Sequence, residues 1–289
     1  MLALRETAAT ATDLACRVTG RRQVVRAARF VLRRACLDIP NDLHTNGESS
    51  LQRWLLRFAP PGQRIHVIDV GANVGRWSAA MLAAAVSAGR AADLDLHAFE
   101  PSAYTFQRME SALHGREVTL HQMAVSDRAG WSRLHVMAPG AGTNSLHTPP
   151  DGRVVQSTEE VPVTTLDYYA ATAGLGELAL VKIDTEGNDF SVLRGARGLF
   201  ASQRIAVAQF EYNHRWIAAR CYLRDAFELL TPLGYRIGKL TPGGVEFYPG
   251  WDPELETFVE GNYVVCRESA ARQLPTVQWW KTADLRPPG

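Results

Sequence analysis

The sequence predicts an α/β protein with a doubly wound, mostly parallel sheet, and three observations support this fold class. Short apolar runs, typical of strands buried on both faces, alternate with helix-like segments from residue 65 to about residue 235. Glycines and acidic residues directly follow several of these runs, at the edge where such sheets bind ligands. The 289 residues, 46% hydrophobic and 21% charged, are enough for one large domain with an extension.

The main sheet is expected to contain seven strands, at residues 65–70, 94–99, 118–123, 178–183, 205–212, 235–240 and 262–267. Helices are expected at residues 74–87, 104–113, 166–173, 190–200 and 222–230. Two further strands, 131–137 and 153–163, flank a Gly/Pro/Thr-rich loop at 138–152. No clear helix separates the last two main-sheet strands, so one of them should run antiparallel. Together these features predict a Rossmann-like sheet of seven strands.

The N-terminal segment differs from the rest of the chain in charge. Apolar residues at helical spacing predict one helix over 13–37, and residues 1–36 hold eight arginines against two acidic residues. Pro40 breaks the pattern, and Ser49 or Ser50 can cap a second helix that ends at Phe58. We therefore divide the chain into an arginine-rich helical extension, 1–45, and a main domain, 46–289. The extension could cover the sheet or an oligomer interface, or contact an anionic membrane or lipid-linked substrate.

Overall charge and cysteine content narrow the class of protein. The net charge of +1 argues against binding along a nucleic-acid backbone, which needs a basic surface. The four cysteines are scattered without zinc-ligand spacing, as expected for reduced thiols in the cytoplasm. No run approaches the length of about 18 apolar residues that a membrane span needs, and no apolar core like that of a signal peptide is seen. A cytoplasmic protein is therefore expected.

The first expected strand runs directly into a glycine-bearing turn. Gly71 suits a tight turn, and Gly75 allows the next helix to pack closely. Asn73 stands where the dinucleotide fingerprint requires glycine, and Asp69 would repel a pyrophosphate. An acid at this position suits a ligand with a positively charged end. S-adenosylmethionine has such an end and carries no phosphate.

The next two strands end in residues that could complete a nucleoside site. Glu100 closes the second strand and can accept hydrogen bonds from both ribose hydroxyls, with Ser102 two residues later. Met123 and Ala124 follow the third strand, where an apolar side chain and backbone amides could hold adenine. Glu100 alone does not discriminate between nicotinamide cofactors and S-adenosylmethionine, because both contain a ribose. The turn after the first strand does discriminate, since Asp69 and Asn73 disfavour a pyrophosphate and so favour S-adenosylmethionine.

A series of motifs in fixed order is similar to the FkbM family of methyltransferases. The motifs are VIDVGANVG (67–75), FEP (99–101), AVSD (124–127), TNSL (143–146), VTTLD (163–167), VKIDTEG (181–187) and VLRGA (192–196). The resemblance covers roughly residues 46–267 and omits the arginine-rich extension. It implies methyl transfer from S-adenosylmethionine, usually to a hydroxyl oxygen of a sugar, glycolipid or other secondary metabolite. By motif position it assigns cofactor binding to Asp69, Gly71, Asn73, Gly75 and Glu100.

A hydroxyl acceptor needs a group that receives its proton, or a metal that acidifies it. Asp184 and Glu186 follow the fourth expected parallel strand, and Glu211 and His214 lie at the end of the fifth. Helix capping is the alternative explanation for Asp184 and Glu186, and an ordinary surface histidine is the alternative for His214. The carboxylates could also hold Mg²⁺, although their spacing does not demand a metal. The nearby aromatic residues Tyr212, Trp216 and Tyr222 could stack on a sugar or belong to the core.

The sequence therefore predicts an S-adenosylmethionine-dependent O-methyltransferase acting on a small hydroxylated molecule. A nicotinamide-dependent oxidoreductase is an alternative from the same fold class, and a non-catalytic, partner-binding subunit with the same fold is another. A homo-oligomer is possible in each case. A nucleic-acid methyltransferase is disfavoured, because the chain lacks both a broad basic face and a base-flipping tetrad.

Overall fold

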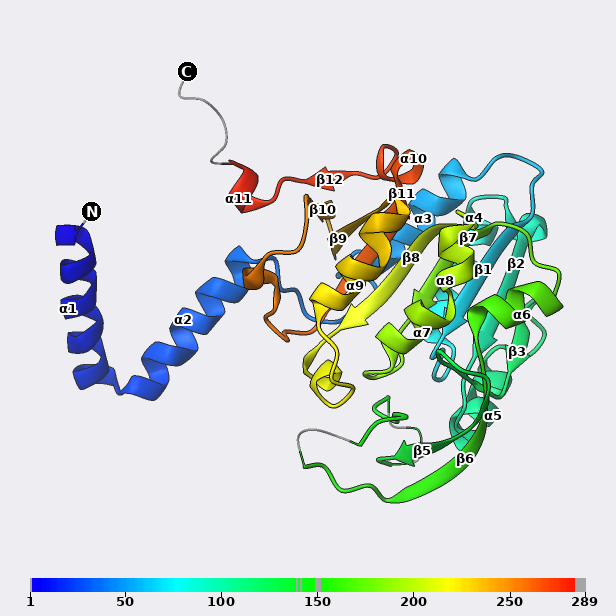
Figure 1. Cartoon of the computed structure of the whole chain (residues 1–289), viewed down its shortest axis with the longest axis horizontal. Helices are drawn as coiled ribbons and strands as arrows, with labels where there is room; N and C mark the ends of the chain where they lie inside the picture. Colours follow the sequence, from blue (N-terminus) through cyan, green and yellow to red (C-terminus); the bar gives the residue numbers. More distant parts are fainter. Residues whose placement is uncertain (1, 139, 141, 149–151, 284–289) are drawn as a thin grey trace. The chain divides into compact units, whose positions relative to one another are not determined.

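The computed structural model describes residues 2–138, 140, 142–148 and 152–283 (Figure 1). The chain divides into two compact units, Met1–Pro40 and Asn41–Gly289. The first unit consists of α1 (Leu2–Thr19) and α2 (Arg21–Ala35). The expectation of one helix over 13–37 was wrong, because Gly20 adopts a φ of 88° between the two helices. A positive φ interrupts the helical backbone, and glycine adopts it without steric penalty.

The second unit is built on a nine-stranded sheet in the order β12-β10-β9-β11-β8-β7-β1-β2-β3. Its strands are β1 (Ile65–Val70), β2 (Leu94–Phe99), β3 (Thr119–His121), β7 (Leu178–Ile183), β8 (Ile205–Tyr212), β9 (Tyr235–Thr241), β10 (Gly244–Tyr248), β11 (Gly261–Arg267) and β12 (Thr276–Val277). The strands β3, β2, β1, β7 and β8 are parallel, whereas β11 lies antiparallel between β8 and β9. All seven expected strands are present, and one of the last two is antiparallel as expected. The hairpin strand β10 and the short β12 raise the count from seven to nine.

Side chains on the two faces of the sheet pack against different helices. The face that carries Ile68 and Val70 belongs to a core shared with α6 (Leu166–Thr172), α7 (Asp189–Gly195), α8 (Arg197–Ala201) and α9 (Leu223–Leu230). The face that carries Ile65 and Val67 packs against α3 (Glu48–Phe58), α4 (Arg76–Ser87) and α10 (Glu268–Ala271). Because both faces are covered, the central strands are continuous apolar runs. The expected helix at 190–200 is instead two helices, α7 and α8, which meet at Ala196.

Smaller helical elements complete the described part of this unit. The helices α5 (Ala103–Ala112) and α11 (Trp280–Ala283) follow β2 and β12, respectively. Short 3-10 turns lie at Ala91–Asp93, His214–Ile217, Thr231–Leu233 and Pro253–Leu255. Met109 and Leu113, at the end of α5, pack on Ala98 of β2 and on Ala72 of the turn after β1. This contact fixes the turn after β1 against α5.

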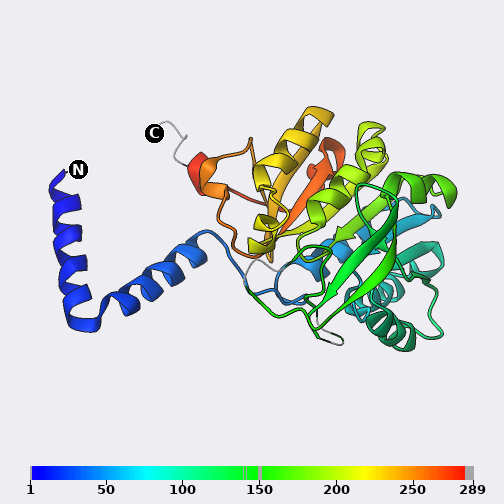
Figure 2. The ribbon, with the colours of Figure 1, turned by 60° about the horizontal axis from the view of Figure 1, so that its bottom comes forward.

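A second, three-stranded sheet lies beside the ends of β1 and β7 (Figures 1 and 2). It consists of β4 (Ala124–Val125), β6 (Ser157–Thr164) and β5 (Gly130–Val136), in that order. The expected strand at 118–123 was therefore only partly right, since β3 ends at His121 and Ala124 already belongs to the small sheet. Within the expected loop 138–152, residues 139, 141 and 149–151 lie outside the described residues. Ser145 pairs with His135 of β5 and donates a hydrogen bond from Oγ to the carbonyl of Glu186 (2.8 Å).

Candidate active site

The carboxyl ends of β1, β2 and β7 and the small sheet enclose a hollow, which we call the first hollow. The predicted site residues that line it are Gly71, Asn73, Glu100, Met123, Ala124, Asp184 and Glu186. Asn144, Ser145 and Leu146, from one of the sequence motifs, also line it. Five predicted residues do not line it: Asp69, Gly75, Ser102, Glu211 and His214. The structure thus brings together seven of the twelve predicted side chains or backbones around one space.

The turn after β1 requires glycine at two positions. Gly71 has a φ of 78°, and a Cβ there would lie 1.9 Å from the carbonyl oxygen of Asp184. The backbones after β1 and β7 can approach so closely only because this side chain is missing. Gly75 also has a positive φ, and a Cβ there would lie 2.9 Å from Leu113, the residue after α5. Gly75 therefore lets the turn pack against α5 and does not itself line the hollow.

Glu100 is held at the rim of the first hollow by backbone amides. The amide of Asn73 donates to Oε2 (3.1 Å), and the amide of Ser102 donates to Oε1 (2.9 Å). Burial raises the pKa of Glu100 to about 7, although these two hydrogen bonds favour the carboxylate form. Each carboxylate oxygen has a second lone pair that these bonds leave available. Asn73 adopts a φ of 50° in presenting its amide.

Ser102 itself faces away from the hollow. It precedes α5, is almost fully buried, and its hydroxyl donates to Glu159 Oε1 of β6 (3.3 Å). Glu159 Oε2 also accepts a hydrogen bond from the amide of Ala103 (2.9 Å). Ser102 therefore joins the start of α5 to the small sheet, and its backbone amide holds Glu100 in place.

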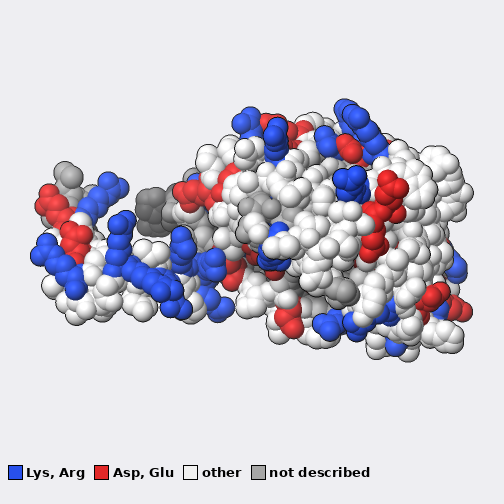
Figure 3. All heavy atoms as spheres, turned by 90° about the horizontal axis from the view of Figure 1, so that it is seen from below, with Lys and Arg blue, Asp and Glu red and all other residues white. Residues whose placement is uncertain are grey.

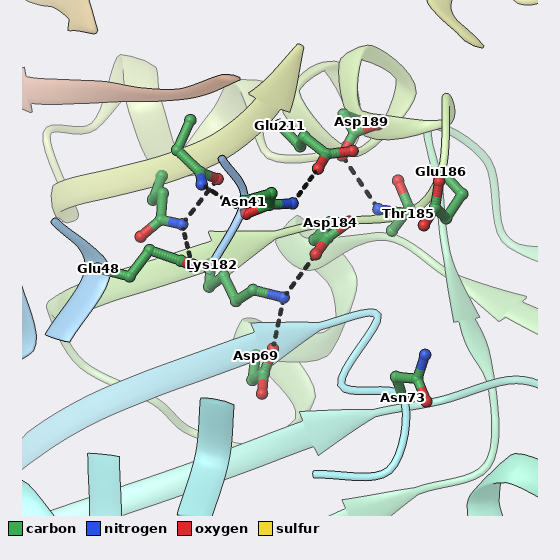
Figure 4. Close-up of polar contacts among 12 residues, drawn as sticks. Asn41, Glu48, Asp69, Asn73, Lys182, Asp184, Thr185, Glu186, Asp189 and Glu211 are labelled. Atoms are coloured by element: carbon green, nitrogen blue, oxygen red, sulfur yellow. Dashed lines mark hydrogen bonds and ion pairs between the residues drawn. The ribbon is translucent and has the colours of Figure 1, made fainter. Parts of the chain in front are cut away.

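A buried lysine connects two acidic residues at the ends of neighbouring strands (Figure 4). Lys182 of β7 extends its ammonium group to within 3.5 Å of Asp69 Oδ1 and 3.3 Å of Asp184 Oδ2. Asp69 is completely buried, and its Oδ2 accepts a hydrogen bond from Ser78 Oγ of α4 (2.7 Å). Burial raises the pKa of Asp69, against the opposing effects of Lys182 and Ser78. The side chain of Asp184 is 31% exposed, so it alone of the three reaches solvent to a substantial extent.

The charge state of Lys182 follows from its neighbours. Burial lowers the pKa of the ammonium group, but the carboxylates of Asp184, Asp69 and Glu48 outweigh burial and leave this pKa above its ordinary value. Lys182 therefore remains cationic at neutral pH. Its positive charge compensates the buried carboxylate of Asp69.

The segment Asp184–Glu186 is not the cap of the following helix. α7 begins at Asp189, whose Oδ1 and Oδ2 accept hydrogen bonds from the amides of Thr185 and Gly187, both at 3.0 Å. Asp189 is fully buried, and burial together with Asp184 raises its pKa to about 7. Neither Asp184 nor Glu186 caps α7, because the N-cap position is Asn188, and Asp189 instead holds the loop that precedes the helix. Both acids are left beside the hollow.

Glu186 lines the first hollow in a constrained backbone conformation. Its φ is 56°, and its Oε2 lies 2.9 Å from the guanidinium of Arg215. Burial and the neighbouring Asp184 raise the pKa of Glu186 to about 8, while Arg215 opposes this effect. Glu186 is thus a carboxyl group that changes protonation state just above neutral pH.

Glu211 and His214, which the sequence also proposed as catalytic residues, lie outside the first hollow. The carboxylate of Glu211 is buried, and it accepts hydrogen bonds from Asn41 Nδ2 (2.8 Å) and from Asn213 Nδ2. Burial raises the pKa of Glu211, and Asp184 and Glu186 raise it further. His214 is half-buried in the 3-10 turn after β8 and borders neither of the two hollows described here. Tyr212 and Trp216 belong to the hydrophobic core.

A second, wider hollow adjoins the first. The two share Gly71, Asn73, Gly142 and Asp184 as lining residues. The second hollow is lined by both apolar and polar side chains. Its polar side chains come from the segment 41–44, from the start of α3, from α4, from α5 and from β7, and include Asn41, Asp42, His44, Glu48, Arg76, Arg108 and Lys182. Asp184 is therefore the one carboxylate that borders both spaces within the described part of the chain.

The family model for the methyltransferase FkbM domain matches residues 69–237. This range runs from Asp69 in β1 to Ile237 in β9 and includes every residue that lines the first hollow. The chain belongs to the FkbM methyltransferase family. Membership implies S-adenosylmethionine as the methyl donor. No curated protein matches the chain in sequence.

Solved structures similar to this FkbM protein are methyltransferases of low sequence identity. One is precorrin-6y C5,15-methyltransferase from Geobacter metallireducens GS-15, with 13% identity over 75% of this chain and 86% of that chain and a TM-score of 0.37. Another is a SAM-dependent methyltransferase from Agrobacterium tumefaciens, with 8% identity, 75% and 60% coverage and a TM-score of 0.39. A third is ribosomal protein L11 methylase from Lactobacillus delbrueckii subsp. bulgaricus, with 11% identity, 77% and 80% coverage and a TM-score of 0.34.

The suggested Mg²⁺ site gains no support in this FkbM protein. Among residues 2–138, 140, 142–148 and 152–283, no group of three or more His, Cys, Asp or Glu side chains could hold a metal ion. The three carboxylates considered for this role are engaged separately. Asp184 pairs with Lys182, Glu186 with Arg215, and Glu211 with Asn41. Likewise, no helix in the described part of the chain has the length and apolarity of a membrane span.

Sequence reasoning missed two residues that organise the FkbM site. Lys182 interrupts the otherwise apolar run of β7, and a lysine inside a doubly covered strand was a signal that a carboxylate must lie beside it. Asp189 carried no such signal, because an acid in the first turn of a helix is ordinary. Its role depends on the backbone path from Thr185 to Gly187, which only the folded structure shows.

Proposed function

We propose that this chain transfers a methyl group from S-adenosylmethionine to a hydroxyl oxygen of a small hydroxylated molecule, such as a sugar, a glycoside or another secondary metabolite. The observation that carries the proposal is the position of Asp184, whose carboxylate borders both hollows. A methyl group must pass between a donor site and an acceptor site. A proton acceptor belongs where those two sites meet. Catalysis is assigned to the domain 46–289.

The chemistry of the first hollow fits S-adenosylmethionine. Glu100 offers carboxylate lone pairs to ribose hydroxyls, and the apolar side chains of Met123, Val125 and Leu134 line the same space. The glycine at 71 lets the turn after β1 lie directly against the backbone of Asp184, which brings both turns to the wall of this hollow. These features suit a nucleoside and supply no cluster of cations for a pyrophosphate.

The surroundings of Asp69 indicate a positioning role in place of the cofactor contact expected from the sequence. Its carboxylate is buried against Ser78 and Lys182 and borders neither hollow, so it would not contact a ligand cation directly. Asp184 is the exposed member of the group and brings negative charge to the first hollow. In this proposal Asp69 fixes Lys182, and Lys182 in turn fixes Asp184. The donor site is shaped by the remaining residues predicted for the cofactor, namely Gly71, Asn73, Gly75, Ser102, Met123 and Ala124.

The acceptor is assigned to the second hollow. Its lining combines hydrogen-bond donors and acceptors from Asn41, His44 and Arg76, which suits a ligand with several hydroxyl groups. S-adenosylmethionine supplies, when bound, a methyl group already activated by its sulfonium sulfur. The protein then needs chiefly to hold the acceptor oxygen at about 3 to 3.5 Å from that carbon. Asp184 accepts the hydroxyl proton, and the Lys182 ammonium holds the carboxylate in position through its contact with Oδ2.

The proposal is tested by measuring donor binding and methyl transfer separately. Calorimetry should show binding of S-adenosylmethionine to the full chain at micromolar concentration, and no comparable binding of NADH. Tritium transfer from labelled S-adenosylmethionine to a panel of sugars, glycosides and polyhydroxylated natural products should then yield a methyl ether. EDTA should leave the rate unchanged. Binding of NADH in place of S-adenosylmethionine would overturn the donor, and transfer only to RNA or protein would overturn the acceptor class.

A further inference from the structure

The helix α2 carries its charge on one side. Arg22, Arg26, Arg29 and Arg33 recur at spacings of four, three and four residues, which places them in one stripe along the helix. All four are exposed. Arg21 and Arg34 add to the charge, and the helix has no acidic residue. Figure 3 shows Lys and Arg side chains gathered along the N-terminal helices.

The opposite side of α2 is apolar. By the same helical periodicity, one arc of the helix carries the apolar residues Val24, Ala28, Val31, Leu32 and Ala35. Val31 and Leu32 are 65% and 62% exposed, and Phe30 at the margin is 67% exposed. α2 contains no buried residue, even though it contacts α1. An exposed apolar arc opposite a continuous stripe of arginines is characteristic of helices that lie in a membrane interface.

We propose that α2 binds the surface of a membrane that contains anionic lipids. The apolar arc would enter the boundary between headgroups and acyl chains, and the arginine stripe would contact lipid phosphates. The arginine stripe and the apolar arc together favour a membrane over other partners. A nucleic acid offers phosphates without an apolar interior, and a second copy of α2 offers an apolar face together with six like charges. A bilayer with acidic headgroups matches both the charge and the apolar arc.

The inference does not depend on the methyl-transfer proposal, because it uses only residues of α2. It assigns a task to a segment outside the family match, which begins at residue 69. A catalytic unit held at an anionic surface would meet acceptors that carry a lipid or reside in that surface. The acceptor need not be a lipid for the membrane contact to hold.

The test is co-sedimentation of the full chain with vesicles of phosphatidylcholine, with and without phosphatidylglycerol. We expect sedimentation only with phosphatidylglycerol, and loss of it at high salt because the headgroup attraction is screened. The variant R22Q/R26Q/R29Q/R33Q should bind roughly a thousandfold more weakly. The variant V31S/L32S keeps every charge and should also lose binding. Circular dichroism should show that both variants retain their helices.

A matched control removes the same charge elsewhere. R57Q/R128Q/R133Q/R197Q changes four exposed arginines of the second unit and should bind vesicles like the unaltered chain. Equal loss of binding in this control would show a net-charge effect and overturn the proposal. Binding of V31S/L32S at full strength would also overturn it, because the apolar arc would then be irrelevant. RNA binding through the arginine stripe, with no sedimentation by vesicles, would assign α2 to a nucleic acid instead.

Discussion

The ammonium group of Lys182 lies 3.3 Å from Asp184 Oδ2. The same nitrogen lies 3.5 Å from Asp69 Oδ1. Lys182 and Asp69 are buried, whereas Asp184 is partly exposed. One lysine therefore joins a carboxylate of the core to a carboxylate of the site. Stability and catalysis should consequently respond together to changes at Lys182.

Replacing Lys182 with methionine should destabilise the protein by about 3 to 5 kcal/mol, because Asp69 would remain buried without a compensating charge. Urea unfolding followed by circular dichroism measures this loss. The pKa of Asp69 is already raised, so removing Lys182 should raise it further. A folded-state pKa above the unfolded value means that stability falls as pH rises between the two values. The variant should therefore be less destabilised at acidic pH than at neutral pH.

The double variant K182M/D69N provides the control for that result. Removing the buried carboxylate together with its partner should restore part of the lost stability, since no uncompensated charge remains. If the double variant is as unstable as the sum of both single variants, the interaction between Lys182 and Asp69 contributes nothing. Lys281, which pairs with Asp252 at the surface, serves as the comparison site, and K281M should have a much smaller effect.

Replacing Asp184 with asparagine should reduce the turnover number for methyl transfer by about a hundredfold to ten-thousandfold, the usual contribution of a general base. The affinity for S-adenosylmethionine should change much less, because Glu100 and the turn after β1 remain intact. Turnover with saturating donor, together with calorimetric affinity, separates the two effects. The control D93N alters an aspartate paired with Arg90, outside both hollows. Unchanged turnover in D184N would remove Asp184 as the proton acceptor.

Donor binding should depend on pH through Glu100. Its pKa is raised from 4.5 to about 7, so the side chain is protonated below that pH and ionised above it. If the carboxylate accepts hydrogen bonds from ribose hydroxyls, affinity for S-adenosylmethionine should increase as pH rises through about 7 and then level off. The variant E100Q should bind roughly tenfold to a hundredfold more weakly at high pH and lose this dependence. E117Q, at an exposed position, should retain both affinity and pH profile.

Replacing Gly71 with alanine tests the close approach of the turns after β1 and β7. The new Cβ would meet the Asp184 carbonyl oxygen at 1.9 Å and require a positive φ, so we expect a loss of about 2 to 5 kcal/mol in unfolding free energy. Gly62 has a similar φ of 70°, but a Cβ at that position would have no other atom within 4 Å. G62A should therefore lose only about 1 to 2 kcal/mol, the cost of the backbone conformation alone. Equal losses in both variants would mean that the approach of the two turns is unimportant.

The central strands could be predicted from sequence with their correct ends. β1, β2, β7 and β8 are apolar runs because helices cover both faces, and polar turn residues mark where each run stops. The edge of the sheet was harder to predict. β10 and β12 are short and depend on pairing with β9 and with each other, which no local pattern encodes. The break at Gly20 was missed because apolar periodicity continues on both sides of it.

The sequence by itself determined the fold class, the family and the order of the loops that line the first hollow, because strand burial and turn chemistry are local properties. Only the tertiary structure decided which acids share that hollow. Asp184 and Glu186 border it, Asp69 is buried and does not line it, and Glu211 is held elsewhere by Asn41 and Asn213. The physical reason is that burial and ion pairing depend on distances between strands far apart in the chain. Lys182 shows this most directly, since its partners lie on two different strand ends.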